Sequence, residues 1–229
     1  MGRKGVREPL NRERVLGVAL ALADADGIQA LTMRHLATAL SIEPMSLYYH
    51  IPNKEGLLDG LVETVIDEIN TAAHRLEPRG TGADWRATLR QWFLSARDVM
   101  LRHPWAPGLI GSRATIPDSV YAYYDGIVAT LVDAGFSYHL AHRALHAFGS
   151  MPLGFAQEIF SPASAGGSMD PDTTEAEFAA MADALPHLTA MVAAEIHNTA
   201  DPTLGWCDSQ VEFEFTLDLL LNGLERIRA

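Results

Sequence analysis

One short segment concentrates side chains suited to contact with nucleic acid. Its residues are short or aromatic, and several carry a hydroxyl or a ring nitrogen: Pro44, Met45, Ser46, Tyr48, Tyr49 and His50. Such side chains can approach base edges or phosphates closely, and they are not typical of a solvated helix face. Lys54 follows at the start of the next expected helix, where a cation and the helix dipole together attract phosphate. The alternative is a buried aromatic cluster at a domain junction, with Met45 filling a gap.

Local signals predict the helices that position this segment. Asn11 is a good N-cap for a helix that ends at Asp26 and Gly27, and Thr32 caps a short second helix. Ser41 and Ile42 make a tight break, and a brief third helix covers roughly 43–50. Asn53 caps a fourth helix over about 53–73. Short helices joined by a tight break, with another helix before them, are the parts of a helix-turn-helix.

The same residues resemble the DNA-binding domain of the tetracycline-repressor (TetR) family over residues 11 to about 65. The similar segments are Thr32-Met33-Arg34-His35-Leu36-Ala37, Leu40-Ser41-Ile42 and Met45-Ser46-Leu47-Tyr48-Tyr49-His50-Ile51-Pro52-Asn53-Lys54. The resemblance implies a homodimeric, all-helical repressor that a small molecule releases from its operator. By position it places Ser46, Tyr48 and Lys54 at phosphates. It places five side chains near bases: Arg34, Pro44, Met45, Tyr49 and His50.

A weaker resemblance to the ligand and dimer domain of the tetracycline repressors continues beyond residue 83. It rests on Gly111-Ser112-Arg113, Asp133-Ala134-Gly135-Phe136-Ser137 and Pro152-Leu153-Gly154-Phe155. That subfamily binds a magnesium chelate of its drug through a histidine where this chain has Leu109 and Ile110, and Asn70 replaces another drug-contacting histidine. Glu158 matches an acidic residue of the site. One carboxylate cannot hold a divalent ion, so no metal and no cofactor are expected.

Helical spacing continues to the end of the chain, and strand signals are nearly absent. We therefore expect an all-α protein with a three-helix helix-turn-helix domain (1–52), a connecting helix and linker (53–82) and a helical ligand-binding and dimerisation domain (83–229). The linker is clearest at Glu77-Pro78-Arg79-Gly80-Thr81-Gly82.

Aromatic residues crowd the first part of the third segment and predict an apolar cavity with a few polar tips. The candidate ligand-binding residues are Trp85, Trp92, Trp105, Tyr121, Tyr124, Phe148, Met151, Phe155 and Glu158. Each aromatic residue by itself is more typical of an ordinary core than of a ligand contact.

Two apolar stripes predict a helix bundle shared between two chains. One stripe is Leu145, Phe148, Pro152, Phe155 and Ile159, and the other is Phe213, Leu217, Leu220, Leu224 and Ile227. Phe215, Leu219 and Leu221 add apolar surface to the other side of the last helix, which must then be covered on both sides. The alternative is a plain single-chain core.

Three histidines lie on one expected helix face, at His139, His142 and His146. The His142/His146 spacing suits a metal, but no glutamate stands between them in the metalloprotease pattern and no thiolate joins them. We interpret them as polar groups at an interface or pocket edge.

Charge is uneven along the chain. Residues 1–60 are neutral, with seven basic and seven acidic residues, and residues 61–229 carry the whole net charge of −12. Five basic groups fall within residues 1–14, so an acidic body with a basic head suits a protein that touches a polyanion at one end. With a single cysteine, Cys207, and no bilayer-length apolar run, we expect a cytoplasmic protein without disulfides.

Two rival functions remain open from the sequence. A helical adaptor without DNA affinity is the first, and the recognition-helix residues argue against it. A small helical enzyme acting through the histidine face is the second, and the missing orienting carboxylate argues against it.

Overall fold

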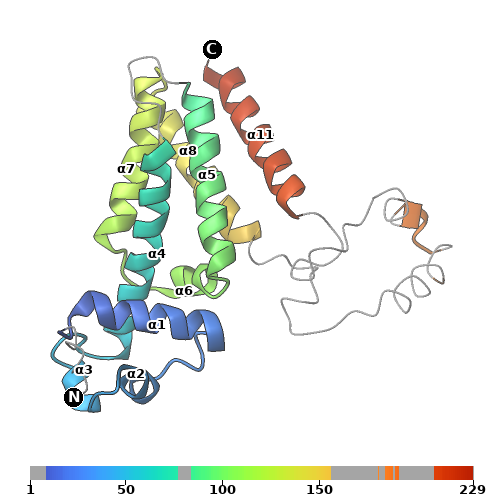
Figure 1. The fold of residues 1–229 in the computed structure, drawn as a ribbon. Helices are drawn as coiled ribbons and strands as arrows, with labels where there is room; N and C mark the ends of the chain where they lie inside the picture. Colours follow the sequence, from blue (N-terminus) through green and yellow to red (C-terminus); the bar gives the residue numbers. More distant parts are fainter. Residues whose placement is uncertain are drawn as a thin grey trace, which may run out of the picture. The chain divides into compact units, whose positions relative to one another are not determined.

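The computed structural model describes residues 9–76, 84–155, 180, 184–187, 189–190 and 209–228. Its helices confirm the all-α class (Figure 1). They are α1 (Arg12–Asp26), α2 (Met33–Leu40), α3 (Pro44–Leu47), α4 (Lys54–Leu76), α5 (Trp85–Arg102), α6 (Ala106–Ser112), α7 (Asp118–Asp133), α8 (Tyr138–Phe155) and α11 (Ser209–Arg228). The chain forms two compact units, 1–152 and 153–229, so α8 crosses the boundary between them.

The predicted helix starts and stops are present in the first unit. The Asn11 side chain accepts a hydrogen bond from the Arg14 amide at 2.8 Å, and Thr32 accepts from His35 at 3.1 Å. Asn53 accepts from Gly56 at 2.8 Å at the start of α4. These caps satisfy amides that a helix leaves without partners.

The turn between α2 and α3 is tight. Ser41 has φ 55°, in the left-handed region, and its amide donates to the Thr38 carbonyl at 3.0 Å. The Ile42 amide donates to the Ala37 carbonyl at 3.1 Å. Helix α3 is shorter than the predicted 43–50, because the amides of His50 and Ile51 both converge on the Leu47 carbonyl and close the chain before Pro52.

Helix α4 joins the two layers of the first unit. In Figure 1, α1, α2 and α3 lie at one end, and α4 rises from them into the group formed by α5, α7 and α8. It packs against α1, α5, α6 and α7. We call α1–α3 the head and the remaining helices of this unit the body.

Aromatic side chains fill the core of the body. Trp92 of α5 meets Tyr123 of α7 edge-on, with ring centroids 5.7 Å apart, and Phe93 stacks on Phe148 of α8 at 4.9 Å. Helices α5 and α7 approach most closely at Gly126, where an added Cβ atom would lie 2.2 Å from the Trp92 ring.

The second unit contains α11, whose apolar residues form two rows. The buried row is Phe213, Leu217, Leu221 and Leu224, and Phe213 meets Phe155 edge-on at 5.5 Å. The exposed row is Val211, Phe215 and Leu219. The buried row of the single chain differs from the predicted stripe at two positions, because Leu221 takes the place of Leu220 and Ile227 is 66 % exposed. The packing of the stripe against a second chain stays a prediction.

The contact at Gly126 makes a stability prediction. Replacing Gly126 with alanine forces the buried Trp92 ring to move, and overpacking of this kind costs about 1–3 kcal/mol. Alanine regains up to about 1 kcal/mol of helix propensity, so we expect a net loss of about 1–2 kcal/mol in the free energy of unfolding.

Gly149→Ala is the matched control, because an added Cβ atom there meets nothing within 4 Å. It should leave stability unchanged or raise it. Urea denaturation of the two variants measures the difference, and equal stabilities would contradict a close contact at Gly126.

Candidate nucleic-acid interface and effector region

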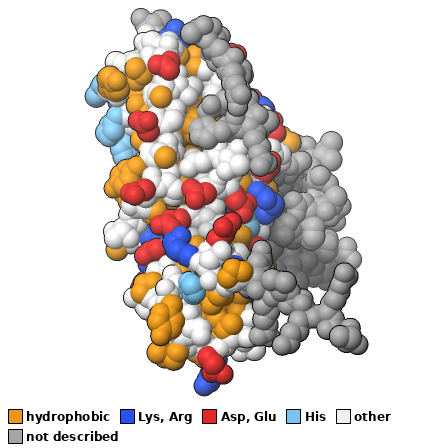
Figure 2. Space-filling view, turned by 60° about the vertical axis from the view of Figure 1, so that its left-hand side comes forward, with side chains coloured by type: hydrophobic (Ala, Val, Ile, Leu, Met, Phe, Trp, Pro, Cys, Tyr) orange, Lys and Arg blue, Asp and Glu red, His pale blue; other side chains and the backbone are white. Residues whose placement is uncertain are grey.

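The outer surface of α3 is an exposed apolar and hydroxyl-bearing patch. Tyr49 is 89 % exposed, Met45 72 % and Tyr48 43 %, whereas Leu47 is fully buried and anchors the helix. Figure 2 shows apolar side chains gathered at the lower end of the molecule, where the head lies. A buried aromatic cluster would hide these rings, so the exposure argues against the alternative.

The other predicted DNA contacts surround this patch with different degrees of exposure. Arg34 and Pro44 are exposed, and Ser46 and His50 are half-buried. All of them belong to α2, α3 or the turn that follows α3, so the structure brings them together at one end. Their contact with DNA stays a prediction.

Lys54 has a different environment from the one the sequence suggested. Its ammonium group donates a hydrogen bond to the Leu31 carbonyl, between α1 and α2. Burial lowers the pKa of Lys54, and Glu55 opposes this effect. The side chain is half-buried and ties α4 to the head, so its phosphate contact stays a prediction with a structural role beside it.

The predicted ligand-binding residues divide into groups. Trp92, Phe148 and Met151 are buried in the body, and Tyr124 lies 6.0 Å from Tyr123, centroid to centroid. Trp85 is also buried, against Phe136 with ring centroids 4.9 Å apart. These residues share one core between α5, α7 and α8.

Three other predicted ligand residues do not join that core group, and a fourth is not described. Tyr121 is 57 % exposed, and Trp105 lies near the head with its indole donating to Asp24 at 2.7 Å. Phe155 packs on Phe213 in the second unit. Glu158 lies outside the described residues.

Asn70, which replaces a drug-contacting histidine in the resemblance, makes a structural contact. Its side-chain amide donates to the Ser119 carbonyl at 3.2 Å and so links α4 to α7. Leu109, at the position of the missing histidine, is buried.

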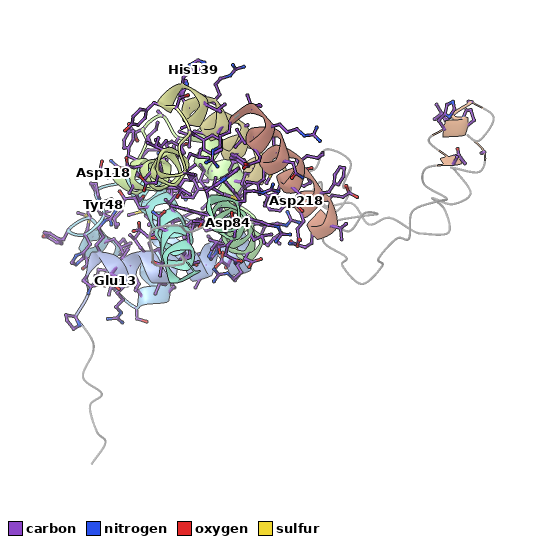
Figure 3. All side chains as sticks on the ribbon, turned by 90° about the horizontal axis from the view of Figure 1, so that it is seen from above. Glu13, Tyr48, Asp84, Asp118, His139 and Asp218 are labelled. Carbon is purple, nitrogen blue, oxygen red and sulfur yellow. The ribbon has the colours of Figure 1, made fainter. Side chains whose placement is uncertain are left out.

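The histidines of α8 lie on an exposed face. Figure 3 labels His139 at the outer edge of the helices, and the Nε2 atoms of His142 and His146 are 3.1 Å apart. Within the described residues, no three histidine, cysteine or acidic side chains are grouped so that they could hold a metal ion.

Two polar links escaped the sequence analysis, one between head and body and one within the body, between the end of α6 and the start of α4. The buried His103 donates from Nδ1 to Asp24 at 2.8 Å, and Asp24 also accepts from Trp105. Arg113 donates to Asp59 at 2.8 Å and to Glu55 at 2.7 Å, and these partners raise the pKa of its guanidinium. The residues that each link joins are more than 50 positions apart in the sequence, so no local sequence pattern predicts these links.

Comparison with known proteins matches both parts of the chain to one family. Residues 15–61 fit the profile described as bacterial regulatory proteins, tetR family, and residues 77–228 fit the tetracyclin repressor-like C-terminal domain. An HTH-type transcriptional regulator of Saccharopolyspora erythraea is 32 % identical over 56 % of this chain, and the match spans 51 % of that protein. Tetracycline repressor protein class E of Escherichia coli is 34 % identical over 65 % of this chain and 68 % of its own length.

A solved structure covers nearly the whole chain. The crystal structure of a possible TetR family transcriptional regulator from Streptomyces coelicolor A3(2) matches 95 % of this chain and all of its own, with a TM-score of 0.74 and 28 % identity. These relatives are named as regulators of transcription and not as enzymes. With its helix-turn-helix and its repressor-like C-terminal domain, the chain belongs to the TetR family of ligand-responsive, DNA-binding bacterial regulators.

Proposed function

We propose that this protein binds a near-palindromic operator in double-stranded DNA as a homodimer and represses transcription until a small molecule releases it. The observation that carries the proposal is the exposed surface of α3 and the turn that follows it, where Met45, Tyr48 and Tyr49 are exposed and Leu47 anchors the helix. A recognition helix must leave such side chains free to reach the major groove. Binding to chromosomal DNA places the protein in the cytoplasm.

The exposed row of α11 supports the homodimer. Val211, Phe215 and Leu219 are each more than half exposed and follow one another at four-residue spacing. Large apolar side chains lined up on one helix face mark a protein interface. A two-fold pair of heads then sets two recognition helices about one DNA turn, or a small multiple, apart, which requires a near-palindromic operator.

The aromatic core between α5, α7 and α8 supports an apolar or aromatic inducer. The core contains Trp92, Phe148 and Met151, and two buried hydroxyls of α5 and α7, Thr88 Oγ1 and Ser119 Oγ, have no hydrogen-bond partner among the described residues. A ligand that bonds to such a hydroxyl regains a hydrogen bond that the free protein lacks. Magnesium-chelated tetracycline fits less well, because Leu109 and Asn70 replace the two histidines.

The adaptor and enzyme alternatives have less support. An adaptor has no need for an exposed tyrosine pair on a four-residue helix. A metal-dependent enzyme built on the α8 histidines needs a third ligand, and in the described part of the chain no three histidine, cysteine or acidic side chains form a group that could hold a metal ion. We infer that the protein acts by binding alone.

Tyr49 provides the test of DNA recognition. Tyr49→Ala should weaken binding to the operator by about ten- to a hundredfold, because a good base contact contributes about 1–3 kcal/mol. Fluorescence anisotropy with the DNA upstream of the protein's own gene measures the change. The melting temperature of the Tyr49→Ala protein should equal that of the wild type, because the side chain is exposed.

Tyr138→Ala on α8 is the matched control, since Tyr138 is 74 % exposed and lies in the body. It should bind the operator as the wild type does. Equal affinities for all three proteins would remove α3 from the interface, and absence of wild-type binding would favour the adaptor.

Phe215 provides the test of assembly. Phe215→Glu should weaken the dimer by about a hundredfold or more, because an unpaired charge cannot be buried cheaply and aromatic residues dominate interface energies. Ile116→Glu places the same charge on an exposed apolar residue between α6 and α7 in the first unit, and it should leave the dimer intact. Sedimentation velocity distinguishes the two, and a monomeric wild type would contradict the proposal.

The inducer should act without a divalent ion. Apolar aromatic compounds that bind the body should raise the melting temperature by the same amount in EDTA and in magnesium, because a ligand stabilises the folded state it binds. Thermal-shift measurements with tetracycline as the comparison compound check this. A shift seen with tetracycline and magnesium together, and lost in EDTA, would show that the subfamily's metal chemistry survives.

A further inference from the structure

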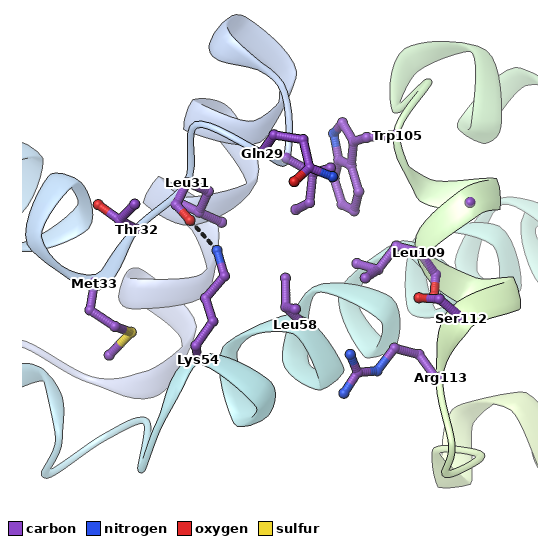
Figure 4. Close-up of a pocket in the computed structure, with 12 residues that line it drawn as sticks. Gln29, Leu31, Thr32, Met33, Lys54, Leu58, Trp105, Leu109, Ser112 and Arg113 are labelled. Atoms are coloured by element: carbon purple, nitrogen blue, oxygen red, sulfur yellow. Dashed lines mark hydrogen bonds between the residues drawn. The ribbon is translucent and has the colours of Figure 1, made fainter.

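A cavity lies where the head meets the body, away from the aromatic core. It has a volume of about 770 Å³ and opens between the α1–α2 loop, the first turns of α4, and α6 (Figure 4). This volume is within the range of small-molecule sites. The walls come from elements on both sides of the joint between DNA-binding and effector parts.

The cavity has an apolar side and a polar side. Its apolar wall includes Trp105 and Leu109 from the α6 region and Leu58 from α4. Gln29, Thr32, Lys54 and Arg113 supply polar groups. An aromatic ring against Trp105 and the leucines would bury apolar area, at about 25 cal/mol per Å².

The two cations in the lining differ in their partners. Arg113 is already neutralised, because Glu55 and Asp59 both accept hydrogen bonds from it. Lys54 donates to an uncharged carbonyl, and among the described residues no carboxylate lies within ion-pair distance of its ammonium group. A half-buried ammonium has three donors, so two remain for a further acceptor.

We propose that this cavity binds an aromatic carboxylate, with the ring against Trp105, Leu58 and Leu109 and the carboxylate on Lys54. A carboxylate suits the site because a charge-assisted hydrogen bond is about twice as strong as a neutral one. The site is distinct from the aromatic core proposed for the inducer.

Occupation of the cavity should lower operator affinity. Lys54 links α4 to the loop before α2, and a bound carboxylate neutralises the same cation that the family resemblance assigns to phosphate. A ligand shifts the equilibrium between the DNA-bound and the free protein only if it binds the two states with different affinities. Here the carboxylate prefers the free protein, because DNA and carboxylate compete for the ammonium group of Lys54.

The experiment compares 2-naphthoate with its uncharged amide, 2-naphthamide, on the full chain without DNA. Isothermal titration calorimetry should show naphthoate binding about tenfold or more tightly, since hydrogen bonds to charged groups contribute about 1.5–3 kcal/mol. Lys54→Gln should remove the difference, and Lys54→Arg should restore part of it. Arg102→Gln is the control, because Arg102 is an exposed cation of α5 that pairs with Glu68 and does not line the cavity.

The chain offers an internal control, because Lys54 is one of only two lysines and the other is Lys4. Naphthoate should protect Lys54, and not Lys4, from acetylation by acetic anhydride, as mass spectrometry reads out. Ser112→Trp, at the exposed rim, should block naphthoate binding without disturbing the core.

Equal affinity for naphthoate and naphthamide, or a preference that persists in Lys54→Gln, would overturn the proposal. Unprotected Lys54 at saturating naphthoate would overturn it as well. Because these measurements contain no DNA, a negative result would not contradict the operator-binding proposal. In the same way, a protein that does not bind the operator could still be tested for naphthoate binding.

Discussion

The close approach of α1 and α4 at Gly60 is the constraint on which the arrangement of the head depends. A Cβ atom at Gly60 would lie 2.7 Å from the Leu16 side chain, which is buried on α1, so any larger residue at this position forces Leu16 to move. Three residues further along α4, Glu63 pairs with Arg12 of α1 at 2.5 Å. Since α4 continues into the body, a displacement of α4 carries the head with it.

The links that complete the joint are polar and few. Asp24 receives two donors from the body, His103 and Trp105, and Arg113 reaches back to the first turns of α4. His103 and Arg113 have side chains only 6 % and 13 % exposed. Exposed ion pairs contribute about 0–1 kcal/mol, whereas leaving a buried polar group without its partner costs about 1–3 kcal/mol. These links therefore favour one geometry of the joint more than a surface pair would.

The sequence predicted most helix ends and the DNA-facing segment, because both depend on local chemistry. Asn11, Thr32 and Asn53 cap their helices as expected, and Tyr49 is exposed on the predicted helix. What failed depends on tertiary packing. Where Leu219, Leu220 and Leu221 are consecutive, spacing alone cannot decide which leucine is buried, and Trp105 cannot be assigned to the head or the core before α6 is placed. The cavity at Lys54 combines three separate segments, so no motif predicts it.

The incomplete packing at the joint has a thermodynamic consequence for regulation. Couplings between an effector site and a distant site are typically 1–3 kcal/mol, which is a five- to 150-fold change in affinity. The free energy of one polar link, such as the hydrogen bond between Asp24 and His103, is of the same size as such a coupling. Separating an apolar interface costs about 25 cal/mol for every Å² exposed. The apolar packing of α1 on α4 at Leu16 and Gly60 closes one side of the joint and resists any effector of ordinary affinity. The side that faces the cavity is held by a few hydrogen bonds, and a ligand that exchanges one of those bonds for its own can shift it.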